Sequence, residues 1–164
     1  IDAHLMKEVG EEFANRFKGL GTTRILTAET SGIAPALSAA LTLDVPLVFA
    51  RKNQPVTMAD NPYKEAAQSH THGKMVELIV SPEYLSSSDR VLILDDFLAS
   101  AKTIKALVKL VQASGATLVG IGAVIEKAFE GGRQALVELG VKDIPVESLV
   151  AIKNFDGDRV NFVD

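Results

Sequence analysis

The sequence contains no cysteine, so disulfides, zinc–thiolate sites and iron–sulfur clusters are all excluded. It has no apolar run near the roughly 20 residues that a membrane-spanning helix needs, and no signal peptide is visible in it. The phosphate-binding motif GxxxxGK[ST] and the dinucleotide motif GxGxxG are also absent. We therefore expect a cytoplasmic protein that has no membrane partner and is not a common type of nucleotide-binding protein.

What is present indicates one globular domain spanning residues 1–164. Apolar residues make up 47% of the chain and charged residues 23%, which suits a domain with a substantial core. Seventeen Lys and Arg stand against 21 Asp and Glu, a formal net charge of −4. This balance argues against a protein that coats nucleic acid.

Short apolar segments alternate with amphipathic ones along the chain. Strands are predicted at residues 24–28, 46–50, 74–80, 91–94, 118–125 and 146–152, before a short ribbon that turns at Asp156 and Gly157. Helices are predicted at 36–43, 104–113 and 131–139, after a first helix capped by Asp2. Such alternation predicts an α/β fold in which helices cover both faces of a mostly parallel central sheet.

Three polar segments follow predicted strands. They are ETSGIAP at 29–35, RKNQP at 51–55 and DDFLASAKT at 95–103. Ligands of parallel sheets bind at the carboxyl ends of the strands, so we expect these segments at one rim. Residues 51–73 show no clear period and predict a long functional loop, with room for one irregular hairpin.

The segment DDFLASAKT combines two kinds of anion chemistry. Asp95 and Asp96 can accept hydrogen bonds from vicinal hydroxyls or hold hydrated Mg²⁺ through its waters, although a strand end with one helix-capping Asp is the simpler alternative. The residues after them predict a helix N-terminus that can cradle a phosphate: Ala99, Ser100, Ala101, Lys102 and Thr103. Diol-binding carboxylates beside a phosphate cradle describe a site for ribose 5-phosphate.

At this point a family resemblance is evident. VLILDDFLASAKT resembles the phosphoribosyl-pyrophosphate signature of the type I phosphoribosyltransferases. ETSGIAPALSAAL, DVPLVFARK, GIGAVIEKAFEGGR and VESLVAIK are similar, in order and spacing, to the bacterial xanthine phosphoribosyltransferases over nearly the whole chain. The resemblance implies a type I phosphoribosyltransferase fold with a flexible lid loop and a small hood. It also implies a pentosyltransferase of purine salvage, which converts xanthine and 5-phosphoribosyl 1-pyrophosphate to XMP and pyrophosphate.

The resemblance assigns roles to matching positions of the sugar donor's site. Asp95 and Asp96 would be the catalytic pair on the ribose hydroxyls, and residues 99–103 would hold the 5-phosphate. The pyrophosphate would lie against Thr30, Ser31, Gly32, Arg51 and Lys52, the last two acting in the neighbouring subunit of a homodimer. Glu29 would help to order this site. Mg²⁺ would accompany the donor through substrate and waters, without a direct protein ligand.

The purine would lie at the other end of the site. Lys127 would donate to the exocyclic oxygen of a 6-oxopurine, and Phe129 would stack on the ring. A surface lysine and a core phenylalanine are the alternatives for these two residues. His70 and His72 have i, i+2 spacing, which suits loop histidines better than a metal site.

Two departures from the family pattern bear on function. Ala101 and Lys102 replace both glycines of the wider pattern, and Ala101 would be strained by about 1 kcal/mol if the loop requires a positive φ there. Relatives carry a hood segment before the match that begins at Ile1, so we expect the hood to be incomplete. Two alternatives stay open: a purine regulator that senses phosphoribosyl pyrophosphate, and a transferase for hypoxanthine, guanine or adenine.

Overall fold

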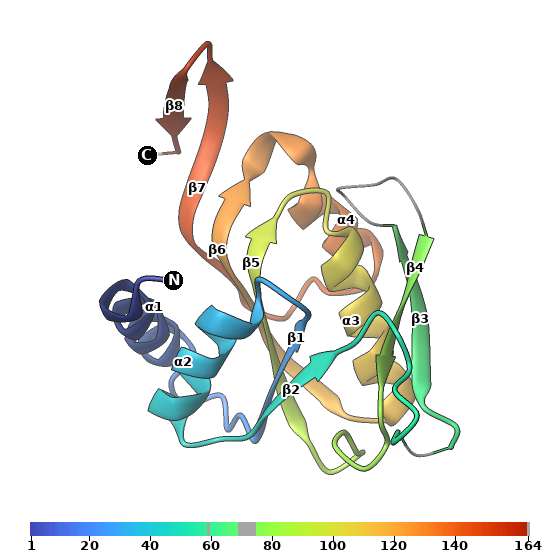
Figure 1. Cartoon of the computed structure of the whole chain (residues 1–164). Helices are drawn as coiled ribbons and strands as arrows, with labels where there is room; N and C mark the ends of the chain where they lie inside the picture. The colour runs from blue at the N-terminus through green and yellow to red at the C-terminus, as the bar shows by residue number, and fades with distance from the viewer. Residues whose placement is uncertain (59, 69–74, 164) are drawn as a thin grey trace.

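The chain is built on a six-stranded sheet with the strand order β2-β1-β5-β6-β7-β8 (Figure 1). The computed structural model describes residues 1–58, 60–68 and 75–163. The first five strands in this order are parallel to their neighbours, and β8 is antiparallel to β7. The strands are β1 (Arg24–Ala28), β2 (Leu47–Ala50), β5 (Arg90–Leu98), β6 (Thr117–Lys127), β7 (Val146–Asp156) and β8 (Arg159–Phe162). The predicted mostly parallel sheet and the terminal ribbon are confirmed.

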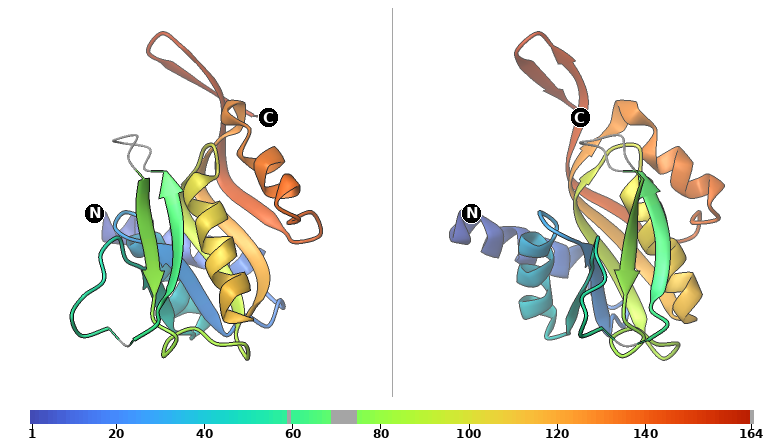
Figure 2. Two further views of the ribbon diagram at one scale, coloured as in Figure 1. Left: turned by 90° about the vertical axis from the view of Figure 1, so that its right-hand side faces the viewer. Right: turned by 45° about the vertical axis from the view of Figure 1, so that its right-hand side comes forward.

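Helices cover both faces of this sheet, as predicted. The elements are α1 (Ala3–Arg16), α2 (Ile33–Leu43), α3 (Lys102–Ser114), the 3₁₀ turn η1 (Ala128–Glu130) and α4 (Gly132–Glu138). The helices α1 and α2 lie on one face, and α3 and α4 on the other (Figures 1 and 2). Among the residues described, none of the helices is long and apolar enough to cross a membrane.

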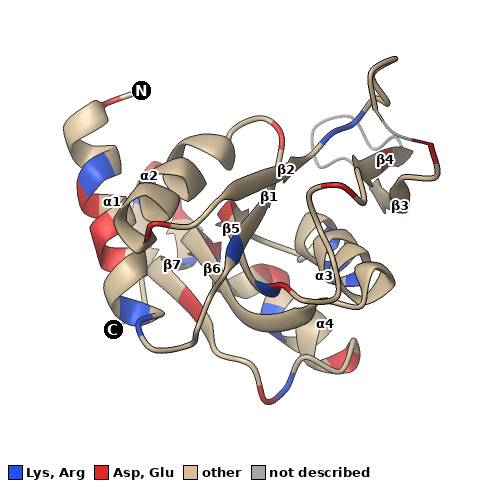
Figure 3. Cartoon of the chain, turned by 90° about the horizontal axis from the view of Figure 1, so that it is seen from below, with Lys and Arg blue, Asp and Glu red and all other residues tan. Residues whose placement is uncertain are grey.

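The sheet separates two hydrophobic clusters. One packs β1, β5 and β6 against α3, and contains the fully buried Ile93 and Leu107. The other packs the opposite face against α1 and α2, with Phe13 and Leu94 in its centre. The first helix begins where predicted, because Asp2 Oδ1 accepts hydrogen bonds from the N–H groups of His4 and Leu5 at 2.9 and 3.1 Å. Acidic and basic residues are interspersed along α1 (Figure 3).

Part of the segment expected to be a long loop is a β-strand. Residues Tyr63–Gln68 form β3, which pairs antiparallel with β4 (Met75–Val80) as a separate two-stranded sheet beside α3 (Figure 2). The sequence YKEAAQ did not indicate a strand, because Lys, Glu, Ala and Gln have low β-propensity. Pairing with the apolar β4 overrides that preference. His70 and His72 lie outside the described residues.

Two predicted boundaries were wrong near the polar rim. The strand expected to end at Leu94 continues as β5 to Leu98, since β6 runs beside it and pairs Asp95 with Ala123 and Phe97 with Ile125. Aspartate has a low β-propensity, but hydrogen bonds to the long neighbouring strand β6 keep Asp95 and Asp96 in the extended conformation. The helix expected at 36–43 begins at Ile33, because a proline in the first turn does not break a helix.

The order of the strands fixes where a ligand can bind. From β1 the chain moves outward to β2, and then returns to β5 on the other side of β1. The connections from β1 and β5 therefore leave the sheet in opposite directions, through α2 on one face and α3 on the other. This switch point opens a crevice at the carboxyl ends of β1 and β5.

Candidate active site

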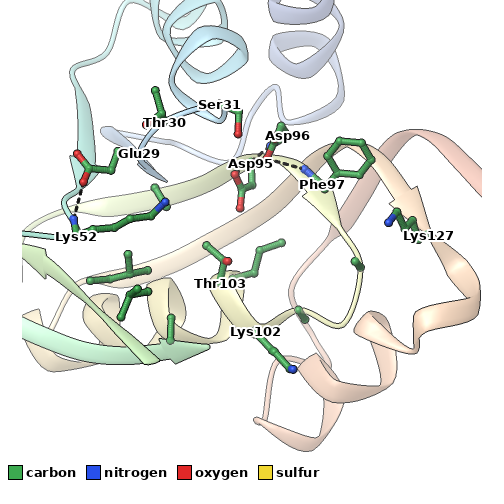
Figure 4. Close-up of a pocket in the computed structure, with 17 residues that line it drawn as sticks. Glu29, Thr30, Ser31, Lys52, Asp95, Asp96, Phe97, Lys102, Thr103 and Lys127 are labelled. Carbon is green, nitrogen blue, oxygen red and sulfur yellow. Dashed lines mark hydrogen bonds between the residues drawn. The ribbon is translucent and has the colours of Figure 1, made fainter. Parts of the chain in front are cut away.

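A cleft with a volume of about 340 Å³ lies at this switch point (Figure 4). Its lining comes from the turn after β1, the end of β5, the start of α3 and the end of β6. The small β3–β4 sheet supplies one apolar wall through Ala67, Val76 and Leu78. The three polar segments predicted to share a rim are thus brought together.

Asp95 and Asp96 form the floor of the cleft. Asp95 is 5% exposed, and its Oδ1 accepts a hydrogen bond from the Asp96 N–H at 3.0 Å. Burial, and then the negative charge of Asp96, raise the pKa of the Asp95 carboxyl well above its ordinary value, while Lys52 acts in the opposite sense. A buried carboxylate of this kind gains stability when a ligand brings hydroxyl donors or positive charge to it.

The segment predicted to cradle a phosphate borders the same cleft. Ala99, Ala101, Lys102 and Thr103 line it, whereas Ser100 is not among the lining residues. Because α3 begins at Lys102, the N–H groups of its first turn have no carbonyl partners within the helix. The side chains of Thr103 and Asp95 face one another across the cleft (Figure 4).

Ala101 adopts the conformation that favours glycine. Its φ and ψ are 61° and 15°, in the left-handed region. An L-residue in this region costs about 1–2 kcal/mol relative to its preferred conformations. The methyl group of Ala101 is buried in the core beneath the cleft, which offsets part of this cost. Ala101 therefore has the positive φ at which backbone strain was expected from the sequence.

The turn after β1 forms the opposite side of the cleft. Thr30 and Ser31 line it, and the Glu29–Thr30 peptide bond is cis. Glu29 Oε1 accepts a hydrogen bond from the backbone N–H of Lys52 at 2.7 Å, which ties this turn to the segment after β2. Gly32 does not itself line the cleft but lies behind it, against Asp95.

Gly32 is required by close approach rather than by its backbone angles. Its φ is −65°, which any residue can adopt. A Cβ at this position would lie 2.4 Å from Thr27 Oγ1 and 2.5 Å from Asp95 Oδ1, far inside van der Waals contact. The missing side chain therefore allows the turn to pack directly over the acidic residue, which differs from the expected approach to a ligand.

The two basic residues after β2 point to different places. Lys52 lines the cleft, and its side chain extends toward Asp95 (Figure 4). Arg51 is exposed and does not line the cleft; its guanidinium lies 6.0 Å from the ring centre of Phe49. Of this predicted pair, only Lys52 belongs to the cleft of its own chain.

Phe129, the aromatic residue predicted to stack on the purine, lies outside the cleft. Lys127 lines the cleft, with Nζ 3.4 Å from Glu130 Oε1 and 5.7 Å from the ring centre of Phe97. Phe129 does not line it and packs edge-to-face on Phe155 at 5.7 Å. Phe97 lines the cleft and is 43% exposed. The sequence did not indicate Phe97 as a lining residue, because the predicted strand ended at Leu94 and β5 in fact continues to Leu98.

An ion pair that the sequence did not indicate, between a buried carboxylate and a half-exposed guanidinium, supports Lys127. The neighbouring Glu126 is 5% exposed and accepts hydrogen bonds from Arg133 at 2.8–3.0 Å and from Ser148 Oγ at 2.7 Å. Arg133 also donates to the carbonyl oxygen of Val146 at 2.8 Å. These bonds join β6, α4 and β7 beside the cleft, and so fix the end of β6 from which Lys127 projects.

The described residues contain no cluster of three His, Asp or Glu side chains that could hold a metal ion by itself. Two adjacent carboxylates suit a hydrated Mg²⁺ that is bound through water and a phosphate-bearing ligand, since Mg²⁺ retains several waters in most protein sites. Asp95 and Asp96 fit this mode of binding because both line the cleft.

Comparison with known families agrees with this geometry. A family model described as the phosphoribosyl transferase domain matches residues 3–145. The chain belongs to the phosphoribosyl transferase family. The matched region contains every element that lines the cleft of this phosphoribosyl transferase, from the turn after β1 to the end of β6.

Individual proteins similar to this chain include two xanthine phosphoribosyltransferases and one adenine phosphoribosyltransferase of known structure. This phosphoribosyl transferase is 48% identical to the xanthine phosphoribosyltransferase of Moorella thermoacetica, over all of this chain and 82% of that protein. It is 46% identical to the xanthine phosphoribosyltransferase of Pseudomonas fluorescens, over all of this chain and 85% of that protein. The adenine phosphoribosyltransferase structure from Thermoanaerobacter pseudethanolicus has a TM-score of 0.78 at 26% identity, covering 92% of this chain and 82% of that one.

Proposed function

We propose that this chain is a xanthine phosphoribosyltransferase of purine salvage, acting as a single domain. It transfers the 5-phosphoribosyl group of 5-phosphoribosyl 1-pyrophosphate to xanthine. The bond from the sugar C1 to the pyrophosphate oxygen breaks, and a bond from C1 to a purine nitrogen forms. XMP and pyrophosphate are the products. Relatives that carry the xanthine name are 44–51% identical to this chain, which supports this choice of base.

The observation that carries the proposal is the acidic pair beside the start of α3. In the proposed complex, Asp95 and Asp96 accept hydrogen bonds from the ribose 2- and 3-hydroxyls. The first turn of α3 and Thr103 donate to the 5-phosphate, which the helix N-terminus also attracts. The positive charge that develops on the sugar in the transition state lies near two carboxylates.

Pyrophosphate leaves from the side of the cleft formed by the turn after β1. Thr30 and Ser31 supply N–H and hydroxyl donors there, and Lys52 supplies positive charge. Mg²⁺, which this family uses with the donor, neutralises charge on the leaving group when it is bound. The lid that was expected from the sequence would span residues 53–73, of which residues 59 and 69–73 lie outside the described residues. In its described part, β3 borders the cleft through Ala67 and would keep water from the sugar.

Lys127 selects the base. Its ammonium group can donate a hydrogen bond to the oxygen on carbon 6 of xanthine, but it cannot accept one from the amino group of adenine. Phe97 lies beside this ammonium group and lines the cleft. In the proposed complex it contacts the purine ring, the role that the family resemblance implied for Phe129. The solved neighbour with the adenine name is only 26% identical to this chain, so it carries less weight for the base.

A homodimer is part of the proposal. Three large apolar side chains are exposed at the α2 edge of the sheet: Leu37 by 47%, Leu41 by 75% and Phe49 by 39%. Arg51 lies over Phe49 and outside the cleft of its own chain. A second copy that covered this edge would bury the apolar side chains and bring Arg51 close to the neighbouring subunit.

The test is a direct assay of the purified chain. The protein is incubated with Mg²⁺, 5-phosphoribosyl 1-pyrophosphate and, separately, xanthine, guanine, hypoxanthine or adenine, and nucleotides are separated by chromatography. We expect XMP to form fastest and AMP slowest. Faster formation of AMP would reassign the base, and binding of the sugar donor without any nucleotide product would favour the regulator instead.

A further inference from the structure

Thr27 has a buried hydroxyl group with no hydrogen-bond partner among the described protein atoms. It lies in β1, two residues before the turn that lines the cleft, and is fully buried. Among the described residues, its Oγ1 is one of two buried side-chain oxygen or nitrogen atoms without a partner; the other is Oγ1 of Thr22. Buried polar groups are nearly always hydrogen-bonded, so such an atom requires an explanation.

The space around this hydroxyl leads to the acidic pair. Oγ1 of Thr27 and Oδ1 of Asp95 lie 2.4 and 2.5 Å from the position that a Cβ on Gly32 would occupy. The two oxygens can therefore be no farther apart than the sum of those two distances. Because residue 32 is glycine, no side-chain atom of that residue stands between them.

The chemistry of the two groups is complementary. A threonine hydroxyl can donate one hydrogen bond, and an ionised carboxylate can accept about four. Asp95 is buried and accepts a hydrogen bond from its neighbour's backbone at 3.0 Å, which leaves it with unused acceptor capacity. With the two oxygens this close, a hydrogen bond from the Thr27 hydroxyl to the Asp95 carboxylate requires a displacement of no more than about 2 Å.

We propose that Thr27 is a positioning residue, whose hydroxyl donates to Asp95 and orients it when the donor sugar is bound. This inference rests on the proposed function, because it concerns the carboxylate that would bind the ribose hydroxyls. Thr27 touches no substrate itself and acts only through Asp95. The hydroxyl without a partner in the free protein is held ready for the ionised, ligand-bound carboxylate.

The test compares stability with binding in a Thr27→Val variant, which keeps the shape of the side chain and removes the hydroxyl. The melting temperature of the free protein should rise, because a buried polar group without a partner is replaced by a methyl group. The dissociation constant for 5-phosphoribosyl 1-pyrophosphate with Mg²⁺, measured by calorimetry, should increase by about tenfold. A purely structural role predicts instead that stability and affinity for the donor fall together, or that affinity does not change.

Two further variants serve as controls. Thr22→Val removes the other hydroxyl without a partner, away from the cleft, and should raise the melting temperature with no change in binding. Thr27→Ser keeps the donor and should restore binding to near the wild-type value. If Thr27→Val binds the sugar donor as tightly as wild type, the inference is wrong. If wild type itself does not bind the donor, the proposed function fails, and with it the role of Thr27.

Discussion

At the scale of single residues, Ala101 shows how the loop before α3 can hold a left-handed backbone conformation without glycine. The residue has a φ of 61° and a buried methyl group, 3% exposed, that packs in the cluster beneath α3. The left-handed conformation is unfavourable for alanine, but burial of the methyl group is favourable. The two effects are of similar size, so the loop keeps its shape with a residue that the family pattern does not contain.

This balance predicts that Ala101→Gly changes the free energy of unfolding by no more than about 0.5 kcal/mol. Relief of about 1–2 kcal/mol of backbone strain is offset by the lost methyl group and by the added freedom of glycine in the unfolded chain. Ala106→Gly, at a buried position within the same helix, should instead destabilise by about 2 kcal/mol. Urea unfolding of the two variants measures the difference, and equal losses would contradict the argument.

At the scale of elements, the ion pair between Glu126 and Arg133 holds β6, α4 and β7 together. Burial acts to raise the pKa of Glu126, but the hydrogen bonds from Arg133 and Ser148 and the charge of Arg133 outweigh it and leave the pKa below its ordinary value of 4.5. The carboxylate therefore stabilises the fold above that ordinary value. The contribution is lost as the pH falls through the lowered pKa.

Arg133→Met should destabilise the protein by about 3 kcal/mol at neutral pH, because it leaves a buried carboxylate without its partner. Half of the Arg133 side chain is exposed, so the expected loss is at the lower end for buried pairs. Without Arg133, burial would raise the pKa of Glu126, and protonation would remove the penalty in acid. The difference in unfolding free energy between wild type and variant should therefore shrink as the pH is lowered, which denaturant unfolding at several pH values measures.

Arg16→Met provides a matched control for this experiment. Arg16 also contacts β7, through the Ser148 carbonyl oxygen at 2.9 Å, but its acidic partners Glu12 and Glu147 are exposed. Exposed pairs contribute about 0–1 kcal/mol, so this variant should lose little stability. A loss from Arg16→Met as large as that from Arg133→Met would show that burial of the carboxylate is not the cause.

The element scale also shows what the sequence could and could not predict. Alternation of apolar segments placed the sheet and the helices on both faces, and β1 was predicted to the residue. The continuation of β5 past Leu94 was missed because Asp95 and Asp96 lower β-propensity. For β3, the sequence predicted only a long loop with room for an irregular hairpin, because Lys, Glu, Ala and Gln also have low β-propensity. Packing also creates the Glu126–Arg133 pair, in which α4 folds back on the end of β6, and the contact between Gly32 and Asp95, which are distant in the chain. Spacing in the sequence alone reveals neither.

At the scale of the whole molecule, the exposed apolar residues Leu37, Leu41 and Phe49 form the α2 edge. They come from a helix and from β2, the edge strand of the central sheet. Scattered single apolar residues on a surface are ordinary, but three at one sheet edge favour a protein interface. The α2 edge is therefore the surface on which the proposed homodimer depends.

Leu41→Glu should weaken the dimer by at least about tenfold, because it would place an unpaired charge in an apolar interface. Val137→Glu is the control, since Val137 is an exposed apolar residue of α4 on the other face of the sheet. Sedimentation over a range of concentrations measures both variants. A dimer that is unaffected by Leu41→Glu, or a wild type that is monomeric throughout, would exclude this interface.

The attachment of the β3–β4 hairpin has a mechanical consequence for the cleft. Within the described residues, a single bridge between Arg51 and Ile79, with hydrogen bonds of 2.9 and 2.8 Å, joins the hairpin to the end of β2. The hairpin is also held to α3 by an ion pair between Lys109 and Glu65 at 3.7 Å, and by apolar side chains such as Leu78 and Val80 that pack in the same cluster as α3. Outward movement of this wall of the cleft would therefore break two backbone hydrogen bonds and an ion pair and expose apolar side chains to water, but it would leave the acidic pair and the start of α3 in place, because these belong to other elements.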